Sequence, residues 1–423
     1  MSFPEPSTFL RQLFDEAVAV ADPMRVVPAA LPPKPDGRIV VVGAGKASAR
    51  MAEAVESVWG PCEGLVITRY GYRRPTAGIE IIEAAHPVPD QAGADATQRM
   101  LKLLGSTGAG DLVLALISGG GSALLTAPAS DITLDEKQAV TEALLRSGAP
   151  IDRMNIVRKH LSEVKGGQLS AAAYPATVFS LLISDVPGDD PASIASGPTV
   201  GETSTSADAR QILEEFKIDM PDSVTEHLSR ETGVISPGAQ ELESTTNIVV
   251  AAPSKSLEAA ARLARDRGVA VRILGDALEG EARELAATQV ETARGIQAGM
   301  TVGEAPVLLL SGGECTVSGR DRGIGGPNAE FALAAAIALD GADGIHAIAC
   351  DTDGVDGAAE VAGACISPST LAKAKKLGAD PAEALNTHDS HTFFARLGDQ
   401  IVTGPTLTNV NDFRAFLIEP TRR

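Results

Sequence analysis

The sequence predicts an α/β fold made of two domains. Three short apolar runs, 39–42, 112–117 and 307–310, each lead directly into a cluster of glycines. A continuous apolar run bounded by glycine is typical of a strand buried on both faces, as in a parallel sheet. Segments with helical periodicity separate these runs, and such alternation indicates a doubly wound parallel sheet. The 423 residues favour two hydrophobic cores over one.

The first half of the chain supplies an N-terminal, Rossmann-like domain. Apolar residues at helical spacing predict a first helix over 9–21, which we expect to pack on this domain. The same periodicities predict, in order, strand 39–42, helix 47–58, strands 64–68 and 80–84, helix 92–104, strand 112–117, helices 134–146 and 155–168, strand 176–184 and helix 207–216. After residue 201 the alternation of strands and helices becomes irregular, with many Ser, Thr, Glu and Pro residues. We place the end of the first domain (1–238) within this irregular segment.

The alternation resumes in a C-terminal α/β domain, 239–423. Its expected elements are strand 247–251, helix 255–267, strand 270–274, helix 279–298, strand 307–310, helix 329–339, strand 345–350, helix 368–376, and strands 400–403 and 414–418. We expect the two domains to face each other across an interdomain cleft.

Composition excludes several classes of protein. The formal net charge of −19 repels nucleic acid and anionic membranes, and 3% aromatic residues leave little for base stacking. Segment 1–23 lacks the apolar core of a signal peptide, and glycine, serine and proline interrupt the uncharged segment 112–130. The four cysteines have no CxxC or zinc spacing, which fits reduced thiols. We therefore expect a cytoplasmic protein that binds neither nucleic acid nor membranes.

The glycine loop after the first strand places Lys46 near a helix N-terminus. A Walker A loop would need glycine at Val40, and the dinucleotide fingerprint would need a third glycine at Ser48. One interpretation is a tight turn with a solvated lysine. The other is that Lys46 meets an oxygen of a phosphate or a substrate carboxylate as a point charge.

The loop after the second apolar run offers several backbone N–H groups to an anion. It consists of Ser118, Gly119, Gly120, Gly121 and Ser122. Three successive glycines lose much conformational entropy on folding, which a purely structural turn rarely requires, so anion binding is favoured. The third run leads into a similar cluster that holds Gly312, Gly313 and Glu314.

Positive charges concentrate in the predicted helix 155–168. Arg158, Ser162 and Lys165 lie within helical reach of one another, and two glycines follow. On a chain of net charge −19, a positive patch beside anion loops points to an anionic substrate. An ordinary solvated helix face is the alternative.

Carboxylates cluster in two turns that follow predicted strands. Asp185, Asp189 and Asp190 crowd the first turn, and the second, 351–357, contains Asp353. Clustered carboxylates repel one another unless a cation lies among them, and Mg²⁺ prefers a few carboxylates together with phosphate oxygens. Metal-assisted phosphoryl transfer would explain the glycine loops, cations and carboxylates together.

Ordered motifs run along nearly the whole chain. They occupy residues 42–47, 118–124, 158–167, 183–199, 311–314, 325–331, 351–357, 403–406 and 409–412. In these motifs the chain resembles the glycerate 2-kinase family, the class II glycerate kinases with a C-terminal MOFRL domain. Members of this family are also called hydroxypyruvate reductases of tartrate catabolism.

The resemblance implies ATP- and Mg²⁺-dependent phosphorylation of D-glycerate at its 2-hydroxyl, giving 2-phosphoglycerate and ADP. Lys46 matches the family's catalytic lysine. Many members carry arginine where this chain has Pro327, so Arg320 and Arg322 in the same loop are the alternatives for that charge, and we assign Arg322. The full assignment is Lys46, Asp185 and Arg322 as catalytic groups; Ser118, Gly119, Gly120, Gly121, Ser122, Gly312, Gly313 and Glu314 at the nucleotide; Arg158, Lys165 and Asp353 at the substrate; Asp189 and Asp190 at the metal.

Two other functions compete with the kinase. A hydroxypyruvate reductase would need a nicotinamide site, yet no complete G-x-G-x-x-G follows any predicted strand. A non-catalytic binding protein would keep the anion loops but would have little use for Lys46 together with the aspartates. The oligomeric state is left open, with a homodimer as one alternative.

Overall fold

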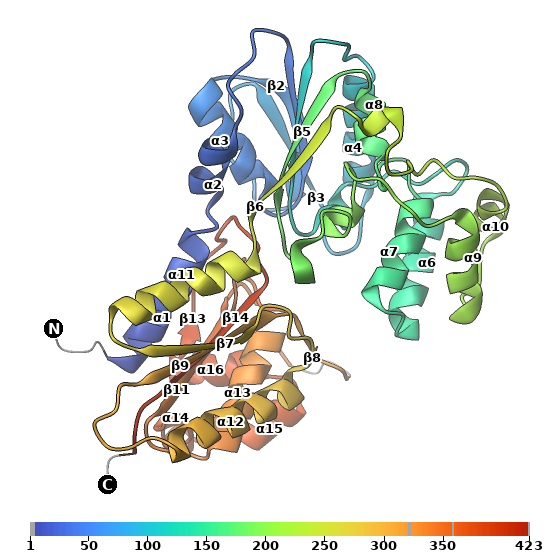
Figure 1. The fold of residues 1–423 in the computed structure, drawn as a ribbon. Helices are drawn as coiled ribbons and strands as arrows, with labels where there is room; N and C mark the ends of the chain where they lie inside the picture. Colours follow the sequence, from blue (N-terminus) through green and yellow to red (C-terminus); the bar gives the residue numbers. More distant parts are fainter. Residues whose placement is uncertain (1–4, 320–322, 358, 422–423) are drawn as a thin grey trace. The chain divides into compact units, whose positions relative to one another are not determined.

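The computed structural model describes residues 5–319, 323–357 and 359–421. Contacts within the chain divide it into two compact units. The first unit is Pro23–Val250, and the second joins Met1–Asp22 to Ala251–Arg423. Each unit is built around its own six-stranded sheet with helices beside it (Figure 1). Among the described residues, no helix has the length and apolar character needed to cross a membrane.

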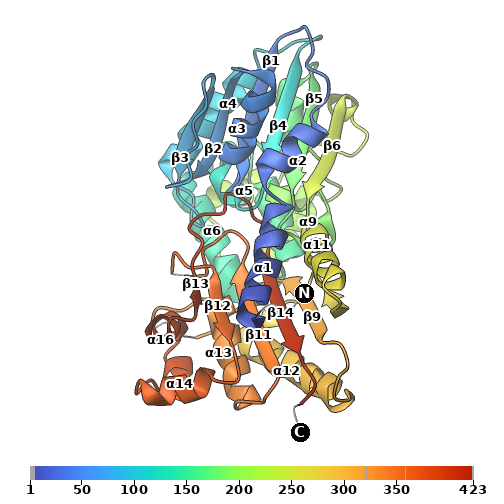
Figure 2. The same ribbon diagram turned by 90° about the vertical axis from the view of Figure 1, so that its left-hand side faces the viewer.

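The sheet of the first unit has the strand order β3-β2-β1-β4-β5-β6, as Figure 2 shows. Its strands are β1 (Ile39–Ala44), β2 (Glu63–Arg69), β3 (Ile79–Ala84), β4 (Leu112–Ile117), β5 (Thr177–Ile183) and β6 (Thr245–Ala251). The pairs from β3 through to β5 are parallel. This is the order of a doubly wound sheet whose winding reverses between β1 and β4. Ligands bind at such a switch point, so the loops after β1 and β4 are where a site is expected.

Helices cover both faces of this sheet, which explains why every residue of β1 and β4 is buried. The helices are α2 (Pro23–Ala30), α3 (Ser48–Trp59), α4 (Gln91–Leu104), the single turn α5 (Gly121–Leu124) and α8 (Gln168–Ala173). One core cluster joins β1 and β4 to α4 and α8 through residues such as Val42, Met100 and Leu169. Helix α3 contacts β1, β2 and β4.

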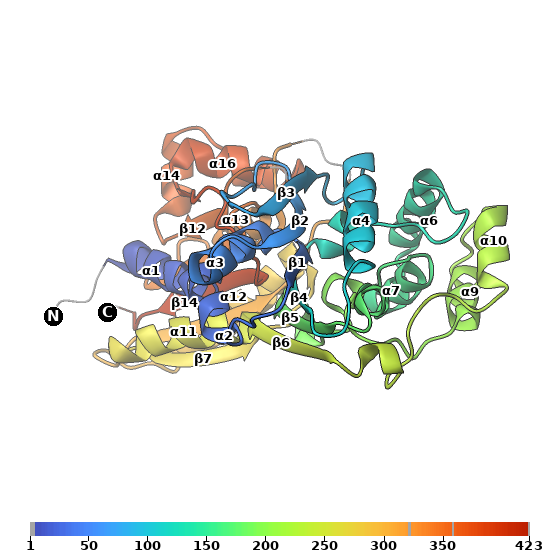
Figure 3. The ribbon, with the colours of Figure 1, turned by 90° about the horizontal axis from the view of Figure 1, so that it is seen from above.

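Four further helices form a lobe of the first unit, seen from above in Figure 3. They are α6 (Leu134–Ser147), α7 (Ile151–His160), α9 (Ser206–Glu215) and α10 (Asp222–Leu228). The lobe has an apolar core of its own, which includes Leu144, Val157 and Leu213. It carries two of the cationic side chains described below.

The sheet of the second unit is mixed, with the order β13-β12-β11-β14-β9-β7. Its strands are β7 (Ala270–Gly275), β9 (Val307–Gly313), β11 (Ile345–Asp351), β12 (Gly363–Ile366), β13 (Gln400–Ile401) and β14 (Asp412–Ile418). Only the pair β7 and β9 is parallel among these described strands. The sheet is accompanied by α11 (Pro253–Asp266), α12 (Ala282–Ala298), α13 (Pro327–Leu339), α14 (Thr370–Lys376), α15 (Pro381–Asn386), α16 (Ser390–Leu397) and the short pair β8 (Gly280–Glu281) and β10 (Cys315–Thr316).

Helix α1 (Pro6–Ala19) forms as predicted, but its expected packing on the first domain is wrong. Its apolar face belongs to a core cluster with α11 and with β9, β11 and β14 of the second unit. Ser256 Oγ donates to the carbonyl of Ala17 at 2.7 Å, and Thr408 Oγ1 donates to the carbonyl of Ala21 at 2.8 Å. The compact units therefore differ from the predicted domains 1–238 and 239–423. An apolar stripe on a helix shows that the helix is packed, but it does not show which domain the helix packs on.

The predicted helix 155–168 is also wrong. Helix α7 already begins at Ile151 and ends at His160, and α8 begins at Gln168. Between them, Gly166 and Gly167 have φ of 56° and 83°, a left-handed backbone that does not occur inside a continuous α-helix. Ser162 pairs instead with Pro128 in an isolated bridge. Lys165 thus lies on a loop, and Arg158 lies in the last turn of α7.

Candidate functional site

The loops after β1 and β4 interlock through their backbones. Lys46 N donates to the Gly119 carbonyl at 2.8 Å, and Ala47 N donates to Ser118 Oγ at 3.0 Å. A Cβ on Gly45 would lie 2.1 Å from Ser118 Oγ, and φ of Gly45 is +144°. Glycine is therefore required for this close approach. The interlock fixes Lys46, whose side chain is half-buried, directly beside Gly120.

Glycine is also required for structural reasons in the triple glycine of the β4 loop. Gly120 has φ of +76°, and a Cβ on Gly121 would lie 2.7 Å from the Cβ of Ala195. Ser118 is fully buried with its hydroxyl bonded to the β1 loop, and Ser122 Oγ lies 2.7 Å from Ser196 Oγ. Nucleotide binding by this loop remains a prediction, now confined to its backbone N–H groups and Ser122.

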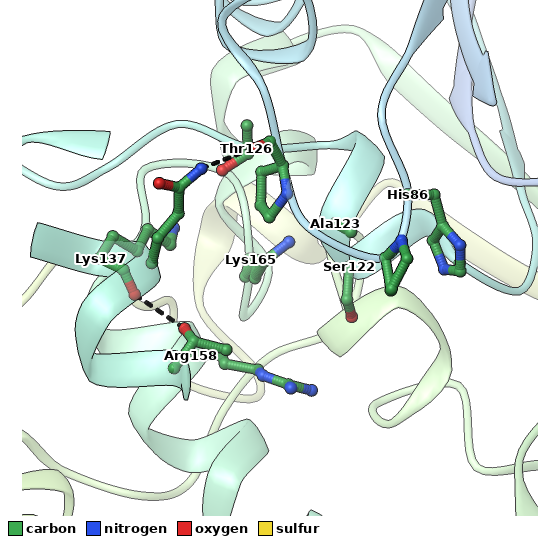
Figure 4. A pocket seen from close by; sticks show the side chains of 12 residues that line it. His86, Ser122, Ala123, Thr126, Lys137, Arg158 and Lys165 are labelled. Carbon is green, nitrogen blue, oxygen red and sulfur yellow. Dashed lines mark hydrogen bonds between the residues drawn. The ribbon is translucent and has the colours of Figure 1, made fainter. Parts of the chain in front are cut away.

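A pocket with an interior of about 180 Å³ opens beside this loop (Figure 4). That is below the roughly 300–1,000 Å³ of sites for drug-sized ligands, so the pocket suits a small molecule. Its charged lining comes from Lys137 on α6, Arg158 on α7 and Lys165 on the 161–167 loop. The remaining lining residues are His86, Pro87, Pro89, Gly120, Ser122, Ala123, Thr126, Gln138 and Thr141. We call it the cation pocket.

The three cations of the cation pocket are desolvated together. Burial lowers the pKa of Lys165 well below its usual value, with Lys137 and Arg158 adding repulsion. Burial lowers the pKa of Lys137 to about 7, although the Glu163 carboxylate opposes this, and burial lowers the pKa of Arg158. Among the described residues, no carboxylate forms a salt bridge with any of the three. Uncompensated buried cations favour binding of an anion.

The structure therefore brings Arg158 and Lys165 together as the sequence suggested, and it adds Lys137. Lys165 Nζ donates to the Leu125 carbonyl at 2.8 Å, and Lys137 Nζ donates to the Ala127 carbonyl at 3.5 Å. Sequence analysis missed Lys137 because it lies among acidic residues, in the segment 134–138, Leu-Asp-Glu-Lys-Gln. The one available signal was its place on the apolar side of helix 134–146, three residues before Val140 and seven before Leu144.

The acidic turn after β5 divides its three aspartates between different environments. Asp190 Oδ1 accepts from Ala192 N at 3.0 Å, so this exposed carboxylate caps its own turn. Asp189 has φ of +56°, and its Oδ1 is buried without a hydrogen-bond partner among the described residues. Asp185 is half-buried. The described residues contain no group of three or more metal-binding side chains.

In the second unit the predicted nucleotide glycines lie inside β9 rather than after it. Gly313 has φ of +109°, and a Cβ there would lie 2.3 Å from the backbone of Leu278. The Gly312 carbonyl accepts from Leu278 N at 3.1 Å and from Arg414 at 2.7 Å. Both glycines thus let a neighbouring segment pack on the strand. The side chain of Glu314 is exposed.

The second acidic turn caps a helix. Asp356 accepts from Asn328 N at 2.9 Å and Ala329 N at 2.8 Å, which satisfies the N-terminus of α13. His391 Nε2 lies 3.0 Å from the same carboxylate. Asp353 is fully buried, and its Oδ1 accepts from Val355 N at 2.8 Å, so it organises the turn itself. A substrate role for Asp353 remains a prediction.

Pro327, where the family arginine is expected, is the first residue of α13 and lines a second hollow of about 430 Å³. Beneath it the buried carboxylate of Glu330 accepts from Arg283 Nε at 2.6 Å and lies 2.9 Å from His388 Nδ1. Arg320 and Arg322, the candidates for the missing charge, lie outside the described residues.

Two family models match the chain. One, described as "Domain of unknown function (DUF4147)", matches residues 9–229, and the other, described as "MOFRL family", matches residues 307–412. A protein of Agrobacterium vitis, provisionally named a hydroxypyruvate reductase, is 52% identical over 414 residues, which cover 97% of this chain and 94% of that protein.

Glycerate kinases match over a similar span. The D-glycerate 2-kinase of Thermotoga maritima is 38% identical over 410 residues, covering 96% of this chain and 97% of that protein. The crystal structure of a glycerate kinase from the same organism superposes with a TM-score of 0.87 at 37% identity, covering 98% of this chain and 99% of that one.

The interlock makes Gly45 more sensitive to substitution than another glycine of positive φ. Gly45→Ala should lower the free energy of unfolding by about 2–4 kcal/mol, because backbone strain adds to a steric overlap. Gly60→Ala, with φ of +74° and nothing within 4 Å of a Cβ, should lose only about 1–2 kcal/mol. Urea unfolding followed by fluorescence of Trp59, the only tryptophan, measures both. Equal losses would contradict the interlock.

Proposed function

This chain belongs to the glycerate kinase family, and from that premise we propose that it phosphorylates D-glycerate at the 2-hydroxyl with ATP and Mg²⁺, giving 2-phosphoglycerate and ADP. The observation that carries the proposal is the cation pocket beside the switch point of the first sheet. A chain with a net charge of −19 buries Lys137 and Lys165 there beside the half-buried Arg158, without a salt bridge from a carboxylate among its described residues. Such a site fits a small carboxylate.

Arg158 and Lys165 hold the glycerate carboxylate in this proposal. Both line the cation pocket together with Ser122 of the β4 loop (Figure 4). A carboxylate anchored by two cations is fixed in position and orientation, which lowers the entropy cost of the reaction. The C2 hydroxyl is adjacent to the carboxylate, so it lies nearer to this anchor than the C3 hydroxyl does. The anchor therefore favours transfer to C2.

The β4 loop and Lys46 serve the phosphates. The backbone N–H groups of Gly119, Gly120 and Ser122 have no hydrogen-bond partner among the described residues, so they are available to phosphate oxygens. Lys46 lies beside Gly120 because of the interlock. As a point charge there it stabilises the negative charge that develops on the transferred group.

Asp189 is the residue best suited to hold Mg²⁺. Its buried Oδ1 lacks a hydrogen bond among the described residues, which is the state of a carboxylate oxygen awaiting a ligand. When bound, Mg²⁺ would neutralise charge on the phosphates. Asp190 already caps its turn, so its assignment as a second ligand has less support. We assign Asp185, in the same turn, to the substrate side, where it would accept the hydroxyl proton.

A reductase is the second candidate, because the relative from Agrobacterium vitis bears that name. The first sheet has the strand order of dinucleotide-binding folds. However, the place of the fingerprint's third glycine is taken by Ser48, whose Oγ donates to the Leu116 carbonyl at 2.9 Å. Oxidation of NADH or NADPH by hydroxypyruvate with the purified protein, without ATP, would establish the reductase and overturn the kinase.

Lys46→Ala should lower kcat by at least about 100-fold, or roughly 2.7 kcal/mol of transition-state stabilisation. The fold should survive, because the backbone N–H of Lys46 that donates to the Gly119 carbonyl is kept in this substitution. Lys102→Ala removes an exposed lysine of α4 and should leave kcat unchanged. Turnover by the Lys46 variant at the rate of this control would reduce Lys46 to a surface charge.

Asp189→Asn should raise the free Mg²⁺ concentration needed for half-maximal activity by about tenfold, because a charged ligand is lost. Asp190→Asn keeps an oxygen that can accept from Ala192 N and should shift this concentration much less. Activity titrated with Mg²⁺ at saturating ATP and glycerate measures both. If both variants titrate as the parent does, the acidic turn is structural and the metal lies elsewhere.

The site of phosphorylation tests the function itself. Product formed from D-glycerate and Mg-ATP should be accepted directly by enolase with no mutase present, which identifies 2-phosphoglycerate. Phosphorus NMR of the product gives the same answer independently. A product that enolase accepts only after mutase is added would be 3-phosphoglycerate, and it would overturn the C2 assignment while leaving a glycerate kinase.

A further inference from the structure

Lys137 is buried in the cation pocket with no evident structural reason for its charge. It lies in the second turn of α6, whose N-terminus is already satisfied by a capping box between Thr133 and Glu136. Its side chain is only 6% exposed. Lysine is rarely buried to this degree unless it is paired, and no salt bridge to Lys137 exists among the described residues.

Lys137 and Lys165 approach the same short segment of backbone. Their ammonium groups donate to the carbonyls of Ala127 and Leu125, two residues apart. An ammonium group has three N–H donors, so each lysine keeps donors for another acceptor. Arg158 lines the same pocket from α7. Three cations that share one small cavity repel one another until an anion enters it.

We propose that Lys137 is a specificity-determining residue, the third cationic ligand of the anion that the cation pocket holds, and that binding of a small hydroxycarboxylate there is coupled to protonation of Lys137. This rests on the proposed function for the identity of the anion. It extends that function by making Lys137 a partner of Arg158 and Lys165 in choosing a small, oxygen-rich anion.

The proton coupling follows from the groups that face Lys137. These are Arg158 on α7, Lys165 and Glu163 on the 161–167 loop, and His86 across the pocket. With the pocket empty, burial lowers the pKa of Lys137 to about 7. A bound anion favours the charged form and raises this pKa again. Above pH 7 the free protein therefore lacks a proton that the complex holds, so binding takes up a proton and weakens as the pH rises.

The lowered pKa of Lys137 also affects the stability of the free protein, and this pH dependence is opposite to that of anion binding. Between pH 7 and the usual lysine pKa, the unfolded chain binds a proton that the free folded protein does not, so stability rises with pH in this window. Replacing a buried, unpaired charge by an apolar side chain of similar length removes the free-energy cost of burying the charge. Lys137→Met should accordingly stabilise the free protein while weakening anion binding. If Lys137 were purely structural, its replacement would not both stabilise the free protein and weaken anion binding.

Titration calorimetry with D-glycerate, without nucleotide, tests the proposal on the full chain. Heats measured at pH 8 in two buffers of different ionisation enthalpy give the number of protons taken up for each ligand bound. Lys137→Met should raise Kd by about tenfold or more, the value of one charge-assisted hydrogen bond, and should reduce proton uptake. Lys137→Arg should keep most of the affinity but take up fewer protons than the parent, because arginine does not titrate and only Lys165, whose pKa burial also lowers, still can. Lys102→Met is the matched control and should behave as the parent.

The outcomes separate the proposal from the proposed function. An unchanged Kd and unchanged proton uptake in Lys137→Met would overturn the role of Lys137, whatever the activity. If D-glycerate fails to bind the parent, inorganic phosphate is titrated in its place. Binding of phosphate that depends on Lys137 would keep the anion site and reject glycerate, whereas binding of neither would overturn both. Should the methionine variant fail to fold, the arginine variant decides, because proton uptake there equal to that of the parent would overturn the coupling to Lys137.

Discussion

The candidate site depends on one steric constraint, the contact between the loops after β1 and β4. Two parallel strands that lie side by side at a switch point send their loops in opposite directions, and the space between them is the site. Here the space is set by Gly45 against Ser118, where even a methyl group would overlap the hydroxyl. The contact turns Lys46 toward Gly120 and presents the β4 loop to the cation pocket. Glycine thus acts by allowing contact between backbones, and any phosphate binding follows from the arrangement that this contact creates.

The charged side chains of the cation pocket lower the stability of the fold. The chain carries nineteen more formal negative than positive charges, yet Lys137 and Lys165 are buried beside Arg158 rather than among carboxylates. Glu163 is the only carboxylate among the described residues that acts on Lys137 enough to oppose its loss of a proton. Buried charges that lack partners persist when function requires them, since an apolar replacement would be more stable. The cation pocket therefore has the character of a binding site even before its ligand is known.

Much of the fold could be predicted from the sequence, because buried parallel strands have a strong pattern. The apolar runs 39–42 and 112–117 lie in β1 and β4 with every residue buried. The wrong predictions concerned contacts between distant segments and backbone angles, which the hydrophobic pattern does not determine. The apolar stripe of α1 did not show that it packs on α11, and the periodicity of 155–168 did not show that α7 ends at His160 and that Gly166 and Gly167 adopt positive φ. Arg158 and Lys165 were predicted to lie together, and they do, but on a helix end and a loop.

The two units also show why clustered polar residues are weak evidence for a site when only the sequence is known. In the second unit three carboxylates of the motifs lie against basic side chains: Asp356 beside His391, Glu330 beside Arg283, and Asp412 beside Arg414. Burial raises the pKa of Asp412 to about 6, while Arg414 and the 2.6 Å hydrogen bond from Asn328 favour its charged form. These groups cap and join elements of that unit. In the first unit Lys159 is paired in the same way with Glu202, but Arg158 and Lys165 form no ion pair with a carboxylate among the described residues. This difference cannot be read from the sequence, and it separates side chains that stabilise the fold from side chains available to a ligand.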